Sequence, residues 1–304
     1  MSSSSDDGPI VGATTARKAD GTNTLTDVRF SLERWLLKTS RNPFVTFSSL
    51  IQPVIFFVLV AEVFGAIAGT ALAETVADVH YVTYLTPAII VQSALAAAAV
   101  SGIGLVDDME TGMFETILVS PMNRSAIFLG KILSEVIRIA VQTLIILGLG
   151  FALLTLKTGA SFGTFARTGI FGLLGVVVVA VIFGGVFMSF SNIVALVTGD
   201  REATIMIANL LTFPLLFVSS AFLPLPALPG WIQTIAIVNP ITYGVDAIRA
   251  LLLGEDVAAV VTVSSLPAPW AVVVPAVLIL VGFNVVLGGI AARSLKRRSR
   301  AEVQ

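Results

Sequence analysis

Long apolar stretches constrain this chain more than any other feature. Six of them have at least the length of about 20 residues that a helix rising about 1.5 Å per residue needs to cross a hydrocarbon core of about 30 Å. They cover residues 44–69, 82–106, 132–156, 169–197, 204–223 and 270–292. Charged residues make up 12% of the 304 residues, about half their share in soluble domains. We therefore expect an all-α membrane protein with six transmembrane helices.

The composition also excludes several kinds of chemistry. The net charge is −1, so the chain lacks the basic excess that a nucleic-acid partner requires. The chain has no Cys, which excludes disulfides, thiolate nucleophiles and Cys-ligated zinc. A single His leaves few options for metal binding or acid–base catalysis. We expect no catalytic residue, metal or cofactor on this chain, and no nucleic-acid partner.

The N-terminal region divides into a polar tail and an amphipathic helix. Residues 1–23 are too polar to bury a core, and we expect a disordered cytoplasmic tail there. Over residues 24–41 apolar side chains recur at three- and four-residue steps, with charged residues between them. This pattern predicts a helix in the cytoplasmic headgroup layer, anchored by Trp35, with Arg34 and Lys38 among its polar positions. The alternative is an ordinary soluble cap helix.

Basic residues indicate the orientation. If the N-terminus is cytoplasmic, fifteen Lys and Arg residues lie on the inner side and only Lys157, Arg167 and Arg249 lie on the outer side. This distribution follows the positive-inside rule. An even number of spans then places both termini in the cytoplasm, and the basic run 293–300 is most simply an anchor near anionic lipid.

The inner loop from residue 107 to 130 is the first informative segment outside the spans. Its apolar side chains Met113, Phe114, Ile117 and Leu118 have helical spacing, and Pro121 ends that helix. Nothing else in this chain is available to cover the apolar face of such a helix in the cytosol. A partner protein is therefore the simplest explanation. The alternative is that the helix folds back onto the membrane surface.

The second informative segment, at about residues 224–256, lies on the outer side. Pro224, Pro226 and Pro229 interrupt the helix, Trp231 follows, and Asn239 with Pro240 separates two helices that are too short to span. This arrangement predicts a re-entrant helical hairpin before the last span. Asp246 and Arg249 are three residues apart on the second helix and can pair. We favour a structural role for this pair over a gate.

Two segments resemble catalytic or nucleotide-binding motifs, but neither has the residues or the context that its motif requires. The Gly159 to Gly163 segment has the spelling of a nucleophile elbow, but it lies in an outer loop without a strand-to-helix turn or a His base nearby. Gly130 and Lys131 resemble the end of a phosphate-binding loop, but Ser125 replaces its first Gly and Ile132 its Ser or Thr. We therefore expect that this chain does not bind ATP through that motif.

A few charged residues lie inside the expected spans, where they are costly. Glu62 is near the outer end of the first span, and Lys131, Glu135 and Arg138 form a local cluster at the inner end of the third. We interpret this cluster as structural. A proton-driven carrier is disfavoured, because proton relays use acidic groups deep in several spans.

The whole arrangement resembles the type-2 ABC exporter permeases, which include the membrane subunits of daunorubicin-resistance-type efflux pumps and of polysaccharide and lipid exporters. Besides the six spans, two groups of residues carry the resemblance. They are Glu110, Gly112, Glu115, Ser120, Pro121, Gly130 and Lys131 in the inner loop, and Pro224, Pro229, Trp231, Asn239, Pro240, Tyr243, Asp246 and Arg249 in the outer segment. One departure is that Asp107, Asp108 and Met109 stand where family members often carry an Arg.

The resemblance implies one transmembrane domain over residues 24–304 that is not itself an enzyme. It implies a coupling helix in a groove of a separate cytoplasmic ATPase subunit, which would bind ATP and Mg²⁺. The coupling residues would be Glu110, Gly112, Phe114, Glu115, Ser120 and Pro121. It also implies a second, identical or related permease chain, and export of an amphiphilic drug, lipid or glycan across the cell membrane.

Two alternatives from other classes remain open. A polytopic membrane enzyme acting on lipids would need clustered polar groups at one membrane face, for which Glu135, Arg138 and the loop acids qualify. An ion-coupled secondary carrier would show internally repeated halves with broken helices, and no such repeat is apparent.

Overall fold

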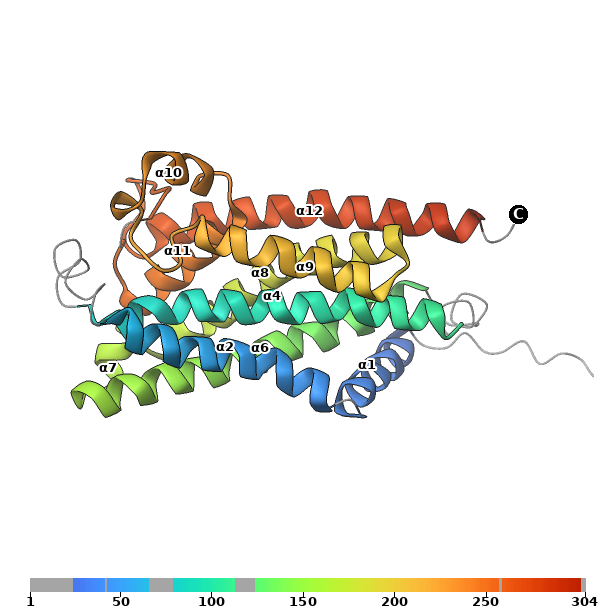
Figure 1. Cartoon of the computed structure of the whole chain (residues 1–304), viewed down its shortest axis with the longest axis horizontal. Helices are drawn as coiled ribbons and strands as arrows, with labels where there is room; N and C mark the ends of the chain where they lie inside the picture. Colours follow the sequence, from blue (N-terminus) through green and yellow to red (C-terminus); the bar gives the residue numbers. More distant parts are fainter. Residues whose placement is uncertain (1–23, 42, 66–78, 113–123, 257–258, 302–304) are drawn as a thin grey trace, which may run out of the picture.

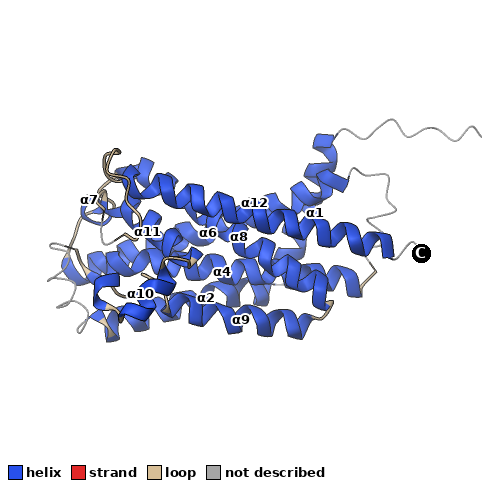
Figure 2. Ribbon diagram, turned by 90° about the horizontal axis from the view of Figure 1, so that it is seen from above, coloured by secondary structure: helices blue, strands red, loops and turns tan. Residues whose placement is uncertain are grey.

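The computed structural model describes residues 24–41, 43–65, 79–112, 124–256 and 259–301. Every regular element in these ranges is an α-helix, apart from the 3-10 helix η1 (Leu225–Ala227). The prediction of an all-α chain is therefore confirmed for the described ranges (Figure 2). The N-terminal tail predicted at residues 1–23 lies outside them.

Within the described ranges, four helices are long and apolar enough to cross a membrane. They are α4 (Tyr81–Glu110), α6 (Arg124–Thr158), α8 (Gly169–Thr198) and α12 (Trp270–Ala301). They correspond to four of the six predicted spans. The two other predicted spans correspond to α2 (Pro43–Val63), which has 21 residues, and to α9 (Arg201–Phe217), which has 17.

The early end of α9 has a physical cause in the side chain of Asn239. Its Nδ2 donates to the carbonyl oxygens of Leu215 and Val218, at 2.6 and 2.8 Å. These bonds satisfy carbonyls that a continuing helix would have used. The chain therefore turns at residues 218–223, where the sequence pattern predicted further helix.

Helix α4 is the centre of the bundle (Figure 1). Of its apolar window 78% is buried within the protein, compared with 28–39% for the three other long helices. It packs against α2, α6, α8 and α9 along its length, and α8 and α11 (Pro240–Leu253) pack against α12. The helix α1 (Thr24–Arg41) lies at the opposite end of the bundle from α10 (Gly230–Ala236), and these ends are called the α1 end and the α10 end below.

Close packing of α4 and α8 depends on a small residue. A Cβ atom at Gly102 would lie 2.7 Å from the backbone oxygen of Ser191, which is closer than atoms can approach. Small residues let membrane helices approach each other where lipid supplies no hydrophobic drive. Gly102 therefore fixes the separation of the two helices.

The tight connection between α8 and α9 follows from two residues. Gly199 ends α8 with a φ of 59°, a left-handed conformation that glycine adopts without strain. Asp200 then caps α9, since its Oδ1 accepts a hydrogen bond of 2.8 Å from the backbone nitrogen of Ala203. These two caps allow the chain to reverse its direction between α8 and α9 within two residues.

The predicted break at Asn239 and Pro240 is confirmed. Helices α10 and α11 meet there at an angle of 84°, and Asn239 caps α11 by accepting from the Ile241 nitrogen at 3.0 Å. Pro240 occupies the first turn of α11, where its missing N–H costs nothing. Such a bent pair is either a broken span or a re-entrant hairpin.

Candidate functional site

Asp108, near the C-terminal end of α4, binds two basic residues of α1. Its Oδ2 lies 3.1 Å from Arg34 Nη2 and its Oδ1 lies 2.7 Å from Lys38 Nζ. The carboxylate is largely buried, with 8% of the side chain exposed. Lys38 also donates to the carbonyl oxygen of Gly104 at 3.1 Å. Three interactions thus hold α1 against the end of α4.

The neighbouring Asp107 makes a weaker contact with a different helix. Its Oδ1 lies 3.4 Å from Arg201 Nη1 at the start of α9, and both side chains are partly exposed. Exposed pairs of this kind contribute little stability. Asp107 and Asp108 are therefore both paired within the chain.

Trp35 is the centre of the contact between α1, α4 and α6. Its side chain is surrounded by three cations, with the guanidinium carbon of Arg34 and the Nζ atoms of Lys38 and Lys131 at 5.1, 5.0 and 5.2 Å from the ring centroid. Cations at this distance are attracted to the face of an indole. The ring also packs against Gly104, where a Cβ atom would lie 3.3 Å from it.

This placement corrects the expectation that Trp35 anchors α1 in the headgroup layer. Trp35 is only 6% exposed, so its indole is buried inside the protein. The polar positions predicted for Arg34 and Lys38 do lie on α1, but both side chains turn toward Asp108. The reason is that α4 and α6 supply a covered surface that the pattern of α1 alone does not reveal.

The start of α6 completes the contact. Ser31 Oγ donates to the carbonyl oxygen of Ile127 at 2.8 Å, and a Cβ atom at Gly130 would lie 2.8 Å from the backbone nitrogen of Leu32. Lys131 Nζ donates to the Ser101 carbonyl oxygen at 3.2 Å and to Asn192 Oδ1 at 3.0 Å. Gly130 and Lys131 thus have packing roles here.

Two of the predicted coupling residues are described. Glu110 is the last residue of α4, and Gly112 follows with a φ of 66°, donating from its nitrogen to the Met109 carbonyl oxygen at 3.2 Å. This left-handed residue ends the helix. Phe114, Glu115, Ser120 and Pro121 lie outside the described residues, as does the helix predicted for them.

At the α10 end, Arg249 is fully buried and contacts three parts of the chain. It lies over the ring of Tyr84 in α4, pairs with Asp246 Oδ1 at 3.4 Å, and donates to the Ser220 carbonyl oxygen at 2.9 Å. Asp246 in turn accepts from Ser220 Oγ at 2.6 Å and from the Val260 nitrogen at 3.0 Å. The predicted pairing of Asp246 with Arg249 is present in the structure.

The remaining residues of the outer segment have smaller roles. Pro224 and Pro229 directly precede η1 and α10, and the Tyr243 hydroxyl donates to the Ile237 carbonyl oxygen across the bend. Trp231 on α10 is 63% exposed. An exposed Trp at the end of a membrane bundle is typical of the membrane–water interface.

The charges expected inside spans have partners. Glu135 Oε2 lies 3.0 Å from Arg138 Nη1, as the spacing suggested, but Lys131 turns toward α4 and α8. Glu62 Oε1 pairs with Lys157 Nζ at 2.7 Å, joining α2 to α6. No sequence pattern indicates this second pair, because its members are far apart in the chain.

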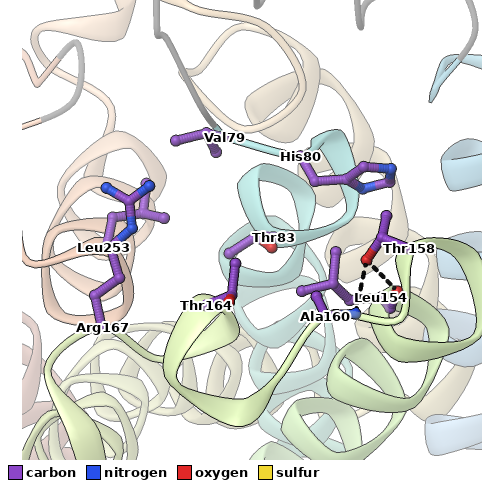
Figure 3. A pocket seen from close by; sticks show the side chains of 9 residues that line it. All are labelled: Val79, His80, Thr83, Leu154, Thr158, Ala160, Thr164, Arg167 and Leu253. Atoms are coloured by element: carbon purple, nitrogen blue, oxygen red, sulfur yellow. Dashed lines mark hydrogen bonds between the residues drawn. The ribbon is translucent and has the colours of Figure 1, made fainter.

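A cavity of about 200 Å³ opens at the α10 end, between the ends of α4, α6 and α11 (Figure 3). It is lined by Val79, His80, Thr83, Leu154, Thr158, Ala160, Thr164, Arg167 and Leu253. Burial lowers the pKa of His80, and the positive charge of Lys157 lowers it further. His80 Nδ1 accepts from the Val82 nitrogen at 3.2 Å, so the imidazole caps α4.

Sequence reasoning missed the cluster around Trp35 and Asp108. A signal was available, since two acids follow the second span directly and α1 presents basic residues at one-turn spacing. Across the described residues, no group of three or more His, Cys, Asp or Glu side chains could hold a metal ion.

Comparison with known proteins identifies the family. The model of the ABC-2 type transporter family matches residues 26–253. The chain is 27% identical over 222 residues to the daunorubicin resistance ABC transporter permease protein DrrB1 of Streptomyces coeruleorubidus, covering 71% of this chain and 72% of that protein. It is 26% identical over 248 residues to the probable doxorubicin resistance ABC transporter permease protein DrrC of Mycobacterium tuberculosis (strain ATCC 25618 / H37Rv), covering 82% and 83%.

A third relative comes from outside the bacteria named above. The putative transport permease ycf38 of Cyanophora paradoxa is 28% identical over 224 residues, which cover 72% of each chain. The family model extends from α1 to the end of α11, and therefore includes Trp35, Asp108, Asp246 and Arg249. The chain belongs to the ABC-2 type transporter family.

Proposed function

We propose that this chain is the permease of an exporter that a separate ATPase subunit drives. The observation that carries the proposal is the family match over residues 26–253. Supporting it, Gly130 and Lys131 pack against α1 and α4 and so are not arranged as a phosphate-binding loop. ATP and Mg²⁺ would bind to the partner ATPase.

The ATPase contact is proposed at the α1 end. It comprises Glu110 and Gly112 at the end of α4, together with Phe114, Glu115, Ser120 and Pro121 in the following segment. The ends of α1, α4 and α6 meet there, so a force applied at this point reaches three helices together. ATP-driven closure of two ATPase chains would then rock two permease chains between inward-facing and outward-facing states.

The proposed topology has six spans in the cell membrane, with both termini and the α1 end in the cytoplasm. In it, α2 and α9 are the first and fifth spans, and α10 with α11 form a re-entrant hairpin on the outer side. The distribution of Lys and Arg supports this orientation. The absence of Cys makes it directly testable, since a single introduced thiol reports its own side of the membrane.

The proposed substrate is an amphiphilic molecule, exported from the cytoplasm or the inner leaflet. The names of two relatives specify daunorubicin and doxorubicin resistance, which supports the drug class; lipids and glycans remain within the proposal. Family membership favours this function over a lipid-modifying enzyme or an ion-coupled carrier. In addition, Glu135 and Arg138, on which the enzyme alternative depends, are paired with each other.

The test is reconstitution of the tagged chain with the ATPase that co-purifies with it in mild detergent. We expect ATP-dependent accumulation of doxorubicin, used as an amphiphilic probe, in inside-out vesicles, and none when the phosphate-binding lysine of the ATPase is replaced. If no ATPase co-purifies, or if transport requires an ion gradient and no ATP, the proposal fails.

A further inference from the structure

The helix α1 is bound more extensively to α6 than to α2, which follows it directly in the sequence. On the α6 side, Ser31 donates to the Ile127 carbonyl, and Gly130 allows its backbone to approach Leu32. A single residue, Asn42, separates α1 from α2. The position of α1 is therefore set by elements distant in sequence.

On the α4 side, the attachment is electrostatic and largely buried. Asp108 is shared by Arg34 and Lys38, at 3.1 and 2.7 Å, and the indole of Trp35 lies among both cations and Lys131. Charged hydrogen bonds in a partly buried site are stronger than those between neutral groups. Removal of Asp108 leaves two partly exposed cations without the carboxylate that they share.

These contacts bind α1 to both ends of the segment that the proposed function assigns to the ATPase. Asp108 lies two residues before Glu110, the last residue of α4, and Ile127 lies in the first turn of α6. A displacement of either helix end is therefore transmitted to α1 through direct contacts. Packed elements of this kind move as rigid bodies, because close-packed interiors deform little.

We infer that α1 and the adjoining ends of α4 and α6 form one rigid lever held by Asp108 and Trp35, which act as positioning residues in coupling. This inference rests on the proposed function, and assigns to α1 the role of carrying the ATPase movement toward α2. Asp108 thus holds α1 from within the chain.

The chain offers a matched pair of variants. Asp108→Asn removes the charge that holds α1, whereas Asp107→Asn removes a neighbouring charge whose partner, Arg201, lies on α9 at 3.4 Å and is partly exposed. We expect Asp108→Asn to lower doxorubicin transport per ATP hydrolysed by about tenfold, within the usual range of coupling energies. Asp107→Asn should change the transport per ATP hydrolysed by less than about twofold, as expected for an exposed pair.

The distance between two spin labels in the Cys-free chain tests directly whether α1 and α6 move as one rigid body. Exposed positions are Arg29 on α1 and Leu129 on α6, each replaced by Cys. In labelled complexes diluted with unlabelled chains, the distance between the labels should be the same in the nucleotide-free and vanadate-trapped states. In the Asp108→Asn background the distance distribution should broaden, and in the Asp107→Asn background it should not.

A covalent rescue separates positioning from folding. Lys38→Cys with Asp108→Cys removes both charges, and a short bifunctional thiol reagent then rejoins α1 to α4. Transport per ATP should be low before the link and should recover after it, with co-purification of the ATPase unchanged throughout. A variant that merely failed to fold would not recover.

Several outcomes would overturn the lever. They are a change in the label distance between nucleotide states in the otherwise unaltered chain, loss of transport on cross-linking, or equal effects of Asp107→Asn and Asp108→Asn. Failure of the proposed function is recognised separately, because no ATPase would then co-purify. The label distance in the isolated permease would still report whether Asp108 holds α1.

Discussion

The guanidinium carbon of Arg249 lies 3.8 Å from the centroid of the Tyr84 ring, although the two residues are 165 positions apart in the chain. Arg249 is 0% exposed, and its charge is balanced by Asp246 on the same helix. Because Ser220 and Val260 also donate to Asp246, this cluster joins α4, α11, the turn after α9 and the segment before α12. It is a buried polar link between these parts of the α10 end.

Replacement of one member of this cluster should be severely destabilising. Arg249→Met leaves the Asp246 carboxylate buried without its cation, which costs about 3–5 kcal/mol. In the double variant with Asp246→Asn the loss should be clearly smaller than the sum of the two single losses, because no unpaired charge remains. Thermal unfolding in detergent measures all three. Additive losses would contradict a direct pairing.

The helix contact at Gly102 gives a second stability prediction. Gly102→Ala places a methyl group 2.7 Å from the Ser191 carbonyl oxygen, so α4 and α8 must separate, at a cost of about 1–3 kcal/mol. Gly148→Ala in α6 is the matched control, because an added Cβ there meets no atom within 4 Å. That change should be neutral or stabilising by up to about 1 kcal/mol. Equal losses in both would show that helix packing at Gly102 is not the cause.

The features that the sequence predicted correctly are those whose signal lies within one short segment of the chain. Apolar length marked α4, α6, α8 and α12, and the Asn239–Pro240 pair marked the bend between α10 and α11. Both signals arise within one segment, from the length of a bilayer-spanning helix or from the missing N–H of proline. The spacing of Asp246 and Arg249 likewise indicated their pairing, because i,i+3 residues share a helix face.

Tertiary contacts account for what the sequence did not predict. The amphipathic pattern of α1 is the same whether Trp35 faces lipid or protein, and only the approach of α4 and α6 decides between them. Glu62 and Lys157 pair between two helices, so no pattern within either helix indicates their contact. The end of α9 at Phe217 depends on Asn239, 22 residues later, and so has no signal within α9 itself.

The histidine beside the cavity makes stability depend on pH. Burial and Lys157 lower the pKa of His80, so between its usual pKa of about 6.5 and the lowered value the unfolded chain binds a proton that the folded chain does not. The stability contribution of His80 is therefore fully present above pH 6.5, and falls as the pH decreases through this window.

The control for this prediction is His80→Asn, which keeps a capping oxygen for the Val82 nitrogen and does not titrate. Melting temperatures of both chains are measured in detergent between pH 8 and pH 5. As the pH falls, the melting temperature of the unaltered chain should decrease relative to that of the His80→Asn variant. A pH-independent difference would mean that His80 has the same pKa in the folded and unfolded states.

Coupling through the inner segment is tested by two replacements that leave the described helices untouched. Phe114→Pro breaks the predicted short helix, and Glu115→Ala removes an acid that the family resemblance assigns to the ATPase contact. Neither residue lies in an expected span, so both variants should assemble and bind the ATPase. Transport per ATP hydrolysed should fall by about tenfold, in the range of typical coupling energies.

Deletion of residues 1–23 serves as the control, because a polar tail of this composition has no apolar surface to transmit force. Transport and ATP hydrolysis are measured in the same vesicles for all three chains. Unchanged efflux and unchanged drug-stimulated ATP hydrolysis in the Phe114→Pro and Glu115→Ala chains would place the ATPase contact elsewhere. Loss of assembly on deletion of the tail would instead assign the tail a structural role, because a passive segment can be removed without a cost in folding.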